Sequence, residues 1–547
     1  MVRFDFDLGI QEVFNKNFSD IKKSNWKSWL DISSPEDYEN FVLKLTCLSN
    51  VENFYEIIKK KETESKDFSV NVESYIKTYN GKDPLVMCHT SGTTNSKGIK
   101  WFNMTRQVIE EIWAPGMQAI FESSGLNSKS SAVIFVPSRM AYDGINNLEE
   151  KEYYSLYSSE FSQRIMLSII NPASYLLYEY KKSNDLLTIS EILSLDNIKV
   201  ISAPSATILK WADLDKLTLG INNSLVSHNM GKSKALDELL KIIEEKGLIK
   251  GSKIIQKRLS KKLSNSVLVF SISSLSESQW ELLRSFMSWE KDEERFTNLY
   301  VASEIGPFAA SIGLGDFETS RKNKLFVFPL TFPTIESKGK KELICYTDQP
   351  RGRLFVSRMQ NSEPLININT GDVIRIENQE GMPQINGKII RFGFPLIYPI
   401  SISEKIILPR NYKVYAGDYF TCENLKIIEP RNLLNCLSEN CKDDIDTMLL
   451  VKNGDNLKSL KMIIPHSFNG PCSDSEKYSK IVGNCPKPKD LINSIKNGKV
   501  ELKIIDEQPV QFLKNRTEML SKVREGQIPK GILKKWPLYI IIPSEDK

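Results

Sequence analysis

The sequence predicts an α/β protein with a large N-terminal domain of stacked sheets and helices and a smaller α+β C-terminal domain. Apolar runs at residues 132–136, 198–201 and 266–275 are typical of buried strands, and amphipathic helical stretches separate them. After about residue 401, short strands such as 500–505 mix with helices. A chain of 547 residues can bury the cores of two or three domains.

The expected domains follow the chain in order. Residues 1–80 are expected to form a helical segment, because Ser34 and Pro35 are typical of a helix start and apolar residues then recur at helical spacing. Residues 81–395 are expected to form the α/β core domain, and residues 396–547 the small C-terminal domain.

Composition and charge argue against several classes of partner. The chain has 73 basic and 68 acidic residues and a net charge of +5, which is too balanced to indicate nucleic-acid binding. No apolar stretch approaches the length of a membrane span, and the N-terminus carries acidic residues where a signal peptide would be apolar. We therefore expect a cytoplasmic protein without nucleic-acid or membrane partners. The sequence does not decide between a monomer and an oligomer.

Eight cysteines in so long a chain do not indicate a disulfide scaffold. Four of them lie in the C-terminal part with His466 among them: Cys436, Cys441, Cys472 and Cys485. No two of the four have the C-x-x-C spacing typical of zinc sites. Structural zinc, disulfides and unlinked thiols are therefore three open interpretations of this group.

A hydroxyl-rich loop follows the apolar run at residues 84–87, which predicts a short strand. The loop, T-S-G-T-T-N-S-K-G at residues 90–98, combines hydroxyl donors with Lys97 and two glycines. Backbone N–H groups, hydroxyls and the lysine can converge on a phosphate at such a bend, where glycine permits the turn. Lys97 is followed by Gly98 and not by Ser or Thr, so this is not the common nucleoside-triphosphatase loop. The alternative is a polar surface turn.

Two later segments carry acidic residues in short motifs. Residues 298–307 place Glu304 beside the hydroxyl of Ser303, and a hard divalent cation prefers oxygen ligands of this kind. Residues 363–374 contain the sequence T-G-D, which ends at Asp372. Taken alone, a T-G-D sequence is more often a simple turn, and an exposed glutamate is usually solvated.

Taken in order, the three segments resemble motifs of the acyl-adenylate-forming superfamily, which includes acyl- and aryl-CoA ligases, peptide-synthetase adenylation domains and firefly luciferase. Residues 90–98 are similar to its T-S-G-T-T-G-x-P-K-G, residues 298–307 to Y-G-x-[ST]-E-x-G, and residues 363–374 to P-L-I-R-Y-x-T-G-D. The resemblance covers about residues 84–404. The short stretch before the loop most resembles the phenylacetate-CoA ligase branch and the plant acyl-amide synthetases.

The resemblance implies a nucleotide site. In it Lys97 and the loop would hold the phosphates, Glu304 would face Mg²⁺, and Asp372 would bind the ribose. The nucleotide-binding residues that it implies are Thr90, Ser91, Gly92, Thr93, Thr94, Ser273, Ser274, Tyr300, Ala302, Ser303, Asp372 and Arg391. Lys388 is the alternative to Arg391.

The resemblance also implies an acid pocket and a catalytic lysine near the C-terminus. Tyr142, Ser205 and Ala206 are the substrate residues that it implies. Lys522 is the first choice for the lysine, and the alternatives are Lys530 and Lys514.

His89 lies directly before the loop. It is expected to be a hydrogen-bonded structural histidine, and a contact with phosphate or with the substrate carboxylate is the alternative.

The implied reaction is ATP-dependent activation of a small carboxylic acid, with Mg²⁺ as cofactor. The carboxylate attacks the α-phosphorus in line and gives an acyl-adenylate and pyrophosphate. The acyl group then passes to the thiol of coenzyme A. Two alternatives stay open: an acyl-amide synthetase on the same fold, and a catalytically inactive nucleotide-binding relative, which Asn95 and a shortened segment near residue 390 would suit.

Overall fold

The computed structural model describes residues 3–31, 37, 40, 69–89, 99–226, 233–271, 277–290, 295–311, 325–337, 340–343, 351–358, 365–377, 384–385, 388–389, 396–400, 406–408, 412–416, 419–422, 425–428, 433, 436–437, 440, 448–452, 460–465, 475–485, 489–505 and 538–543.

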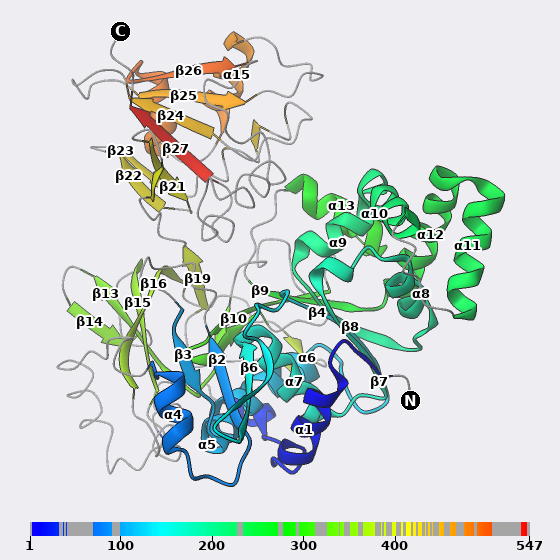
Figure 1. The fold of residues 1–547 in the computed structure, drawn as a ribbon. Coiled ribbons are helices and arrows are strands. Elements are labelled where there is room, and N and C mark those ends of the chain that lie inside the picture. The colour runs from blue at the N-terminus through cyan, green and yellow to red at the C-terminus, as the bar shows by residue number, and fades with distance from the viewer. Residues whose placement is uncertain are drawn as a thin grey trace.

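An eight-stranded sheet forms the centre of the N-terminal part (Figure 1). Its strands, in spatial order, are β1 (Arg3–Asp5), β7 (Ser174–Glu179), β4 (Ser131–Val136), β8 (Ile198–Ser202), β9 (Val267–Ser271), β10 (Phe296–Ala302), β11 (Gly306–Ala310) and β12 (Phe326–Val327). The strands from β1 to β10 run parallel, and β11 and β12 are antiparallel. Apolar side chains fill β4, β8 and β9, as expected for parallel strands that are covered on both faces.

Helices cover both faces of this sheet. One face packs against six helices through Val133, Ile201 and Leu268. These are α8 (Leu186–Ser194), α9 (Ser205–Ala212), α10 (Leu214–Val226), α11 (Lys234–Lys246), α12 (Leu248–Leu263) and α13 (Glu277–Met287), with the short η3 (Tyr180–Lys182) before them. The other face packs on α6 (Ala114–Ser123) and α7 (Ser158–Ile170).

A second sheet of four strands lies beyond α7. Its spatial order is β3 (Trp101–Asn103), β2 (Leu85–His89), β6 (Lys151–Tyr157) and β5 (Gly144–Leu148), and β2 and β6 are parallel. α7 is apolar on two sides: Met166 and Ile170 join the core of the central sheet, whereas Phe161 and Ile165 pack toward the second sheet. The remaining elements of this part are α1 (Leu8–Phe18), η1 (Trp26–Asp31), α4 (Val72–Thr78), α5 (Arg106–Val108) and the π-helical turn η2 (Ile109–Trp113).

A third sheet is antiparallel and has five strands. They are β14 (Lys340–Leu343), β13 (Phe332–Ser337), β15 (Arg351–Arg358), β16 (Leu365–Glu377) and β19 (Leu396–Ile400), in that spatial order. Near them in the chain is a ladder of β17 (Gln384–Ile385) and β18 (Lys388–Ile389).

A mixed sheet of six strands forms the C-terminal part, and the described elements from β20 onward make close contacts with one another. Its order is β20 (Ile406–Leu408), β21 (Tyr412–Ala416), β27 (Leu538–Pro543), β24 (Met448–Lys452), β25 (Leu460–Pro465) and β26 (Val500–Ile505). A two-stranded ladder and two helices accompany it: β22 (Tyr419–Cys422), β23 (Leu425–Ile428), α15 (Ser475–Asn484) and α16 (Lys489–Lys496).

The stacked sheets and helices confirm the predicted α/β class, and the expected strands at 132–136, 198–201 and 500–505 are β4, β8 and β26. The first eighty residues, expected to be helical, also contribute strand β1 to the central sheet. Of the helix expected to begin near Ser34, only residues 37 and 40 are described, and both are helical. The domain boundaries stay predictions, and β19 begins just after the expected boundary at 395 and pairs with β16.

Cys436 and Cys485 form a disulfide. For these two members of the cysteine group, the disulfide interpretation is therefore the correct one. Cys441, Cys472 and His466 lie outside the described residues. Within the described residues, no group of three His, Cys, Asp or Glu side chains is arranged to hold a metal ion.

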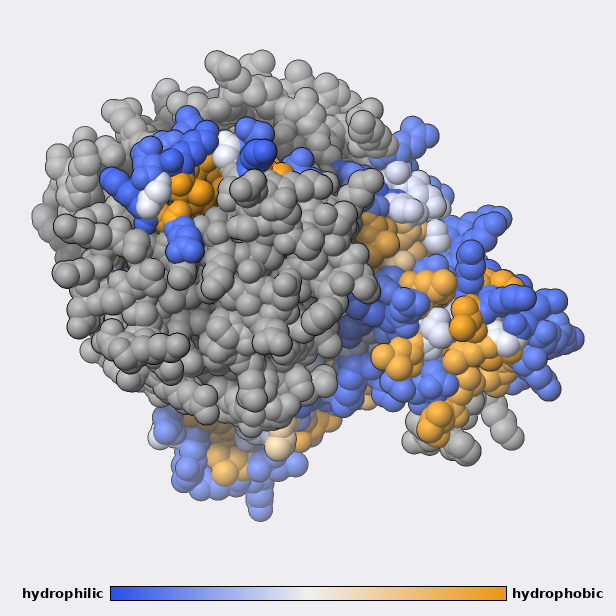
Figure 2. Space-filling model, turned by 90° about the horizontal axis from the view of Figure 1, so that it is seen from above, coloured by the Kyte–Doolittle hydropathy of each residue, from blue (hydrophilic) through white to orange (hydrophobic). Residues whose placement is uncertain are grey.

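The outer surface of the helical layer is mixed in polarity (Figure 2). The exposed apolar side chains there include Leu219, Val226 and Ile249. Among the described helices, none is long and apolar enough to cross a membrane.

Candidate functional site

The parallel strands of the central sheet bring several predicted residues to one edge. Tyr142 follows β4, Ser205 and Ala206 begin α9 directly after β8, and Glu304 follows β10. Because these strands are parallel, their carboxyl ends lie at the same edge, which is where ligands bind in open α/β sheets. The loop after β8 is fixed against the neighbouring strand, since the N–H of Ala203 donates to the carbonyl of Val269 at 3.1 Å.

Glu304 lies at the tip of a tight hairpin between β10 and β11. Ala302 pairs with Gly306, and the N–H of Ile305 donates to the carbonyl of Ala302 at 3.2 Å. Gly306 has a φ of +89°, and a Cβ at this position would lie 2.6 Å from Cγ2 of Ile112. The turn therefore requires glycine here, as the G in the motif suggests.

Two contacts from other elements hold this hairpin. The hydroxyl of Ser303 donates to the hydroxyl of Ser158 at 2.8 Å, and Ser158 is the first residue of α7. Nη1 of Arg358, at the end of β15, donates to the carbonyl of Glu304 at 3.4 Å. Ser303 is buried and Glu304 is half-buried. The hairpin tip thus lies where the first, second and third sheets meet.

The hydroxyl-rich loop starts and ends at the neighbouring edge of the second sheet. Its residues 90–98 lie outside the described part of the chain, but both ends are described. His89, the last residue of β2, pairs with Trp101 of β3 on one side and with Tyr157 of β6 on the other. Tyr157 directly precedes Ser158, so the end of β6 links the start of the loop to the Glu304 hairpin.

His89 is fully buried and lies 2.7 Å from a carboxylate oxygen of Asp143, whose side chain is also fully buried. The rings of Trp101, Tyr142 and Tyr157 surround the imidazole at centroid distances of 4.9, 5.2 and 4.3 Å. Burial, together with the nearby Tyr142 and Asp143, raises the pKa of Tyr157 to about 12. His89 is therefore a hydrogen-bonded structural histidine, as expected from the sequence.

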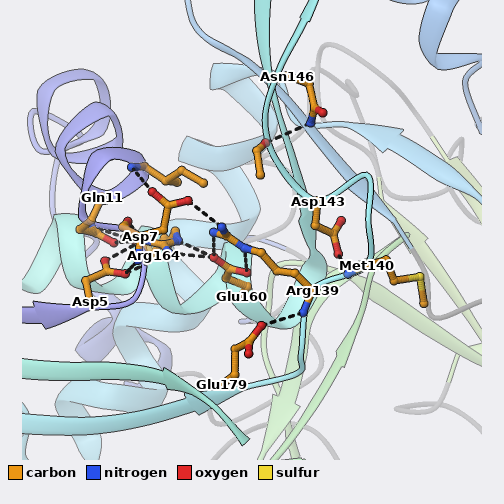
Figure 3. A network of polar contacts seen from close by, with 12 residues as sticks. Asp5, Asp7, Gln11, Arg139, Met140, Asp143, Asn146, Glu160, Arg164 and Glu179 are labelled. Carbon is orange, nitrogen blue, oxygen red and sulfur yellow. Dashed lines mark hydrogen bonds and ion pairs between the residues drawn. The ribbon is translucent and has the colours of Figure 1, made fainter. Parts of the chain in front are cut away.

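A buried network of charges lies behind Asp143 (Figure 3). Arg139 contacts Asp7 at 2.6 Å and Glu160 at 2.5 Å, and Arg164 contacts Glu160 and Asp5, each at 2.8 Å. Burial raises the pKa of Asp5 above its usual value, and the nearby Arg164 offsets this only in part. The network joins β1, α7 and the segment after β4 into one rigid support.

Asp372 lies in the middle of β16, within a bulge. Leu354 of β15 faces the three residues Thr370, Gly371 and Asp372, because the flanking pairs are Arg353 with Val373 and Phe355 with Asn369. The hydroxyl of Thr370 donates to the carbonyl of Leu354 at 2.8 Å and fixes the bulge. The T-G-D sequence is thus a bulge within a strand and not a simple turn, and bulges are common beside active sites.

Strand β15 connects the bulge at Asp372 with the Glu304 hairpin. Leu354, which faces the bulge, and Arg358, which touches the hairpin, are four residues apart on β15, which is roughly 13 Å of strand.

Several predicted residues fall outside the described part of the chain. They are Thr90, Ser91, Gly92, Thr93, Thr94, Lys97, Ser273, Ser274, Arg391, Lys514, Lys522 and Lys530. Ser273 and Ser274 follow β9 in the chain, and Lys388 lies in β18. Of the remaining nucleotide residues, Tyr300 and Ala302 belong to β10.

The sequence does not predict the contacts that three residues of this region make: Asp143, Ser158 and Arg358. Asp143 is 54 residues from His89 in the chain and Ser158 is 145 residues from Ser303. No spacing rule connects residues so far apart, and only the strand pairing brings them together.

Comparisons with known proteins show only that the fold of this chain is similar to that of several solved structures. No family model and no curated protein matches the sequence. MatB from Rhodopseudomonas palustris is similar in structure, with 10% identity, a TM-score of 0.40, and coverage of 80% of this chain and 68% of that chain. The amide bond synthetase McbA from Marinactinospora thermotolerans is similar at 10% identity, with a TM-score of 0.40 and coverage of 79% and 68%.

O-succinylbenzoate coenzyme A synthetase (MenE) from Bacillus subtilis, solved in complex with ATP and a magnesium ion, is similar at 12% identity. Its TM-score is 0.38, and the match covers 77% of this chain and 66% of that chain. At these identities and TM-scores the likenesses assign neither a family nor an activity to the chain. The chain spans about two thirds of the length of each.

Proposed function

We propose that this protein uses ATP to convert a small carboxylic acid into an acyl-adenylate and then transfers the acyl group to the thiol of coenzyme A. One observation carries the proposal: the hydrogen bond between Ser303 and Ser158 joins the Glu304 hairpin to the strand edge at which the hydroxyl-rich loop begins. Two motifs more than 200 residues apart in the chain are thereby neighbours. The order of the motifs in the sequence supports the same reaction.

The residues near the hairpin suit Mg²⁺. Glu304 and the hydroxyl of Ser303 are oxygen donors, which this hard cation prefers, and Mg²⁺ is usually held by one or two carboxylates together with substrate phosphates. The described residues contain no ready-made cluster of three ligands, and a site completed by phosphates does not need one. When bound, Mg²⁺ would neutralise charge on the phosphates.

In this proposal the protein mainly orients and neutralises the reactants. Lys97 and the loop hydroxyls hold the β- and γ-phosphates, Asp372 holds the ribose, and a C-terminal lysine, Lys522 as first choice, neutralises the charge that develops as the acid attacks. The N-terminus of α7 has no side-chain cap and lies next to the loop stem, which favours negative charge there. Tyr142, with Ser205 and Ala206, borders the acid.

Hydroxylamine trapping tests the first step. The protein is incubated with Mg-ATP, hydroxylamine and a broad panel of acids, and we expect hydroxamate and pyrophosphate from at least one acid. ATP binding without any hydroxamate would favour the inactive nucleotide-binding relative. Repeating the assay with coenzyme A or with amines in place of hydroxylamine identifies the acceptor and distinguishes a thiol ligase from an amide synthetase.

Two variants test the named residues. We expect Lys97→Ala to weaken ATP binding and Glu304→Gln to lower metal-dependent pyrophosphate release by about 10²–10³-fold, the size of effect for losing one charge-stabilising group. Lys129→Ala and Glu238→Gln are matched controls, because both are exposed and lie on other parts of the N-terminal half. Near-normal turnover in both test variants would contradict the proposed site.

A further inference from the structure

A cavity lies among α9, α12 and α13 in the helical layer over the central sheet, and α13 contacts both of the other helices (Figure 1). Its volume is about 300 Å³, which is at the lower end of the range for small-molecule sites in proteins. Two lysines line it together with apolar side chains and uncharged polar ones, and none of the described residues that line it is acidic.

The wall between α9 and α12 is held in place by hydrogen bonds. The side-chain amide of Gln256, on α12, donates to the carbonyls of Trp211 and Ala212 at 2.9 Å each. These are the last two residues of α9, where a helix leaves carbonyl groups without partners of its own. The indole N–H of the fully buried Trp211 in turn donates to the carbonyl of Ser183 at 2.9 Å. The cavity is therefore a preformed feature of the helical layer.

Apolar groups form much of the lining. Phe286 and Ala212 are both buried, whereas Leu282 is 38% exposed. The methylene chains of Lys253 and Lys257 add further apolar surface, because a lysine can pack its stem against apolar groups while its ammonium stays in water. The cavity thus offers a hydrocarbon surface to a ligand that has an apolar body.

The charge around the cavity is positive and uncompensated. Lys253 and Lys257 lie one turn apart on α12, a spacing at which like charges repel each other, and α12 has no acidic residue. Neither ammonium group has an ion-pair partner in the described part of the chain. The acids nearest to the lining on the adjacent segments pair with cations of their own segments: Asp213 with Lys216, and Glu281 with Arg284.

We propose that this cavity is a binding site for a small amphipathic anion, in which one acidic head group carries a short hydrocarbon body. The head group pairs with the ammonium groups of Lys253 and Lys257 and removes their mutual repulsion. The body packs against Phe286 and Leu282. Both features are needed, because two partly exposed lysines alone bind an anion weakly.

The cavity is separate from the candidate nucleotide and acid site. Ser205, which borders the acid in the proposed function, is the first residue of α9, and Ala212, which lines the cavity, is the last. Seven residues of helix span roughly 10 Å. The inference therefore does not rest on the proposed function.

Equilibrium dialysis of the full-length protein with radiolabelled octanoate, in the absence of nucleotide, tests the site. We expect octanoate to bind, and octylammonium, which has the same body and the opposite charge, to bind at least about fivefold more weakly. Acetate, which has the charge and lacks the body, should also bind more weakly than octanoate. Octyl phosphate in place of octanoate shows whether the preferred head group is a carboxylate or a phosphate.

Two variants locate the bound probe in the cavity. Lys253→Gln combined with Lys257→Gln should lower the affinity for octanoate at least about fivefold, because two partly exposed ion pairs are lost. Ser285→Phe fills the cavity from an exposed position and should weaken binding without a change in net charge. The matched control is Lys250→Gln combined with Lys261→Gln, since both lysines are exposed on the same helix and neither lines the cavity.

We expect the control variant to keep the wild-type affinity for octanoate. Octanoate binding that stays unchanged in both cavity variants, or an equal loss of affinity in the control, would overturn the proposed site. A wild-type protein that binds neither octanoate nor octyl phosphate would overturn it as well. These measurements use neither ATP nor turnover, so their failure is distinguishable from a failure of the hydroxamate assay.

Discussion

Arg164 is the most deeply buried cation of the charge network behind the site. Its side chain is fully buried between Asp5 and Glu160, and the ring of Phe6 lies 5.6 Å from its guanidinium carbon. Taking these charges out of water is expensive, and only mutual pairing compensates for that cost. The residues that support the candidate site are therefore sensitive to the loss of a single partner.

We expect Arg164→Met to lower the free energy of unfolding by about 3–5 kcal/mol, because it leaves the carboxylate of Asp5 buried without its partner. Urea denaturation monitored by fluorescence measures this loss. The matched control is Arg106→Met, since Arg106 also contacts two carboxylates, Asp20 and Glu110, but at the surface. Arg106→Met should lower the free energy of unfolding by less than about 1 kcal/mol.

The decrease in the free energy of unfolding caused by Arg164→Met should also depend on pH. The folded-state pKa of Asp5 is raised above its unfolded value by burial, so its ionisation opposes folding at neutral pH, and this penalty disappears as the pH falls through the folded-state pKa. The destabilisation by Arg164→Met should accordingly be smaller at mildly acidic pH than at neutral pH. An equal loss at both pH values would contradict the buried Asp5–Arg164 pairing.

At the scale of elements, the disulfide between Cys436 and Cys485 cross-links the C-terminal part. It closes a separation of 49 residues that includes β24, β25 and α15. A cross-link of this length stabilises a fold by about 4 kcal/mol, chiefly by restricting the unfolded chain.

We expect Cys436→Ser to lower the unfolding temperature of the C-terminal part while leaving that of the N-terminal part unchanged. Differential scanning calorimetry with and without reductant measures both transitions. Reductant should destabilise the wild-type protein, and it should have no further effect on a variant with both cysteines replaced by serine. A wild-type protein that is indifferent to reductant would contradict a stabilising role for this bond.

The sequence predicts elements well where the signal is local. Apolar runs identify β4 and β8, because a parallel strand covered on both faces is filled mainly with apolar residues, whereas alternating apolar and polar residues at 500–503 identify β26. It does not predict the bulge at Thr370–Asp372, since this depends on how β16 pairs with β15. The choice of Cys485 as partner of Cys436 likewise depends on how α15 packs, and spacing alone carries no such information.

In the candidate site, too, local motifs are predictable from the sequence and long-range contacts are not. Glu304 and the loop at residues 90–98 are recognisable because each belongs to a short motif. The contact that links the Glu304 hairpin to the loop stem, Ser303 with Ser158, joins residues that are distant in the chain, and so does the contact of His89 with Asp143. They follow from strand order, which a single sequence does not specify.

At the scale of the whole molecule, the candidate site depends on three sheets meeting at one place. The central sheet supplies the Glu304 hairpin, the second sheet supplies the loop stem, and the third supplies Arg358 and the strand that bears Asp372. In the proposed function, each sheet would position a different part of the bound Mg-ATP: metal, phosphates and ribose. The account therefore predicts one nucleotide that touches all three.

The most direct measurement is a crystal structure of the protein soaked with ATP and Mg²⁺. We expect the phosphates against residues 90–98, the metal ion on the carboxylate of Glu304, and the ribose hydroxyls on Asp372. A nucleotide bound elsewhere, or one that contacts the loop while Glu304 faces away from it, would contradict the account.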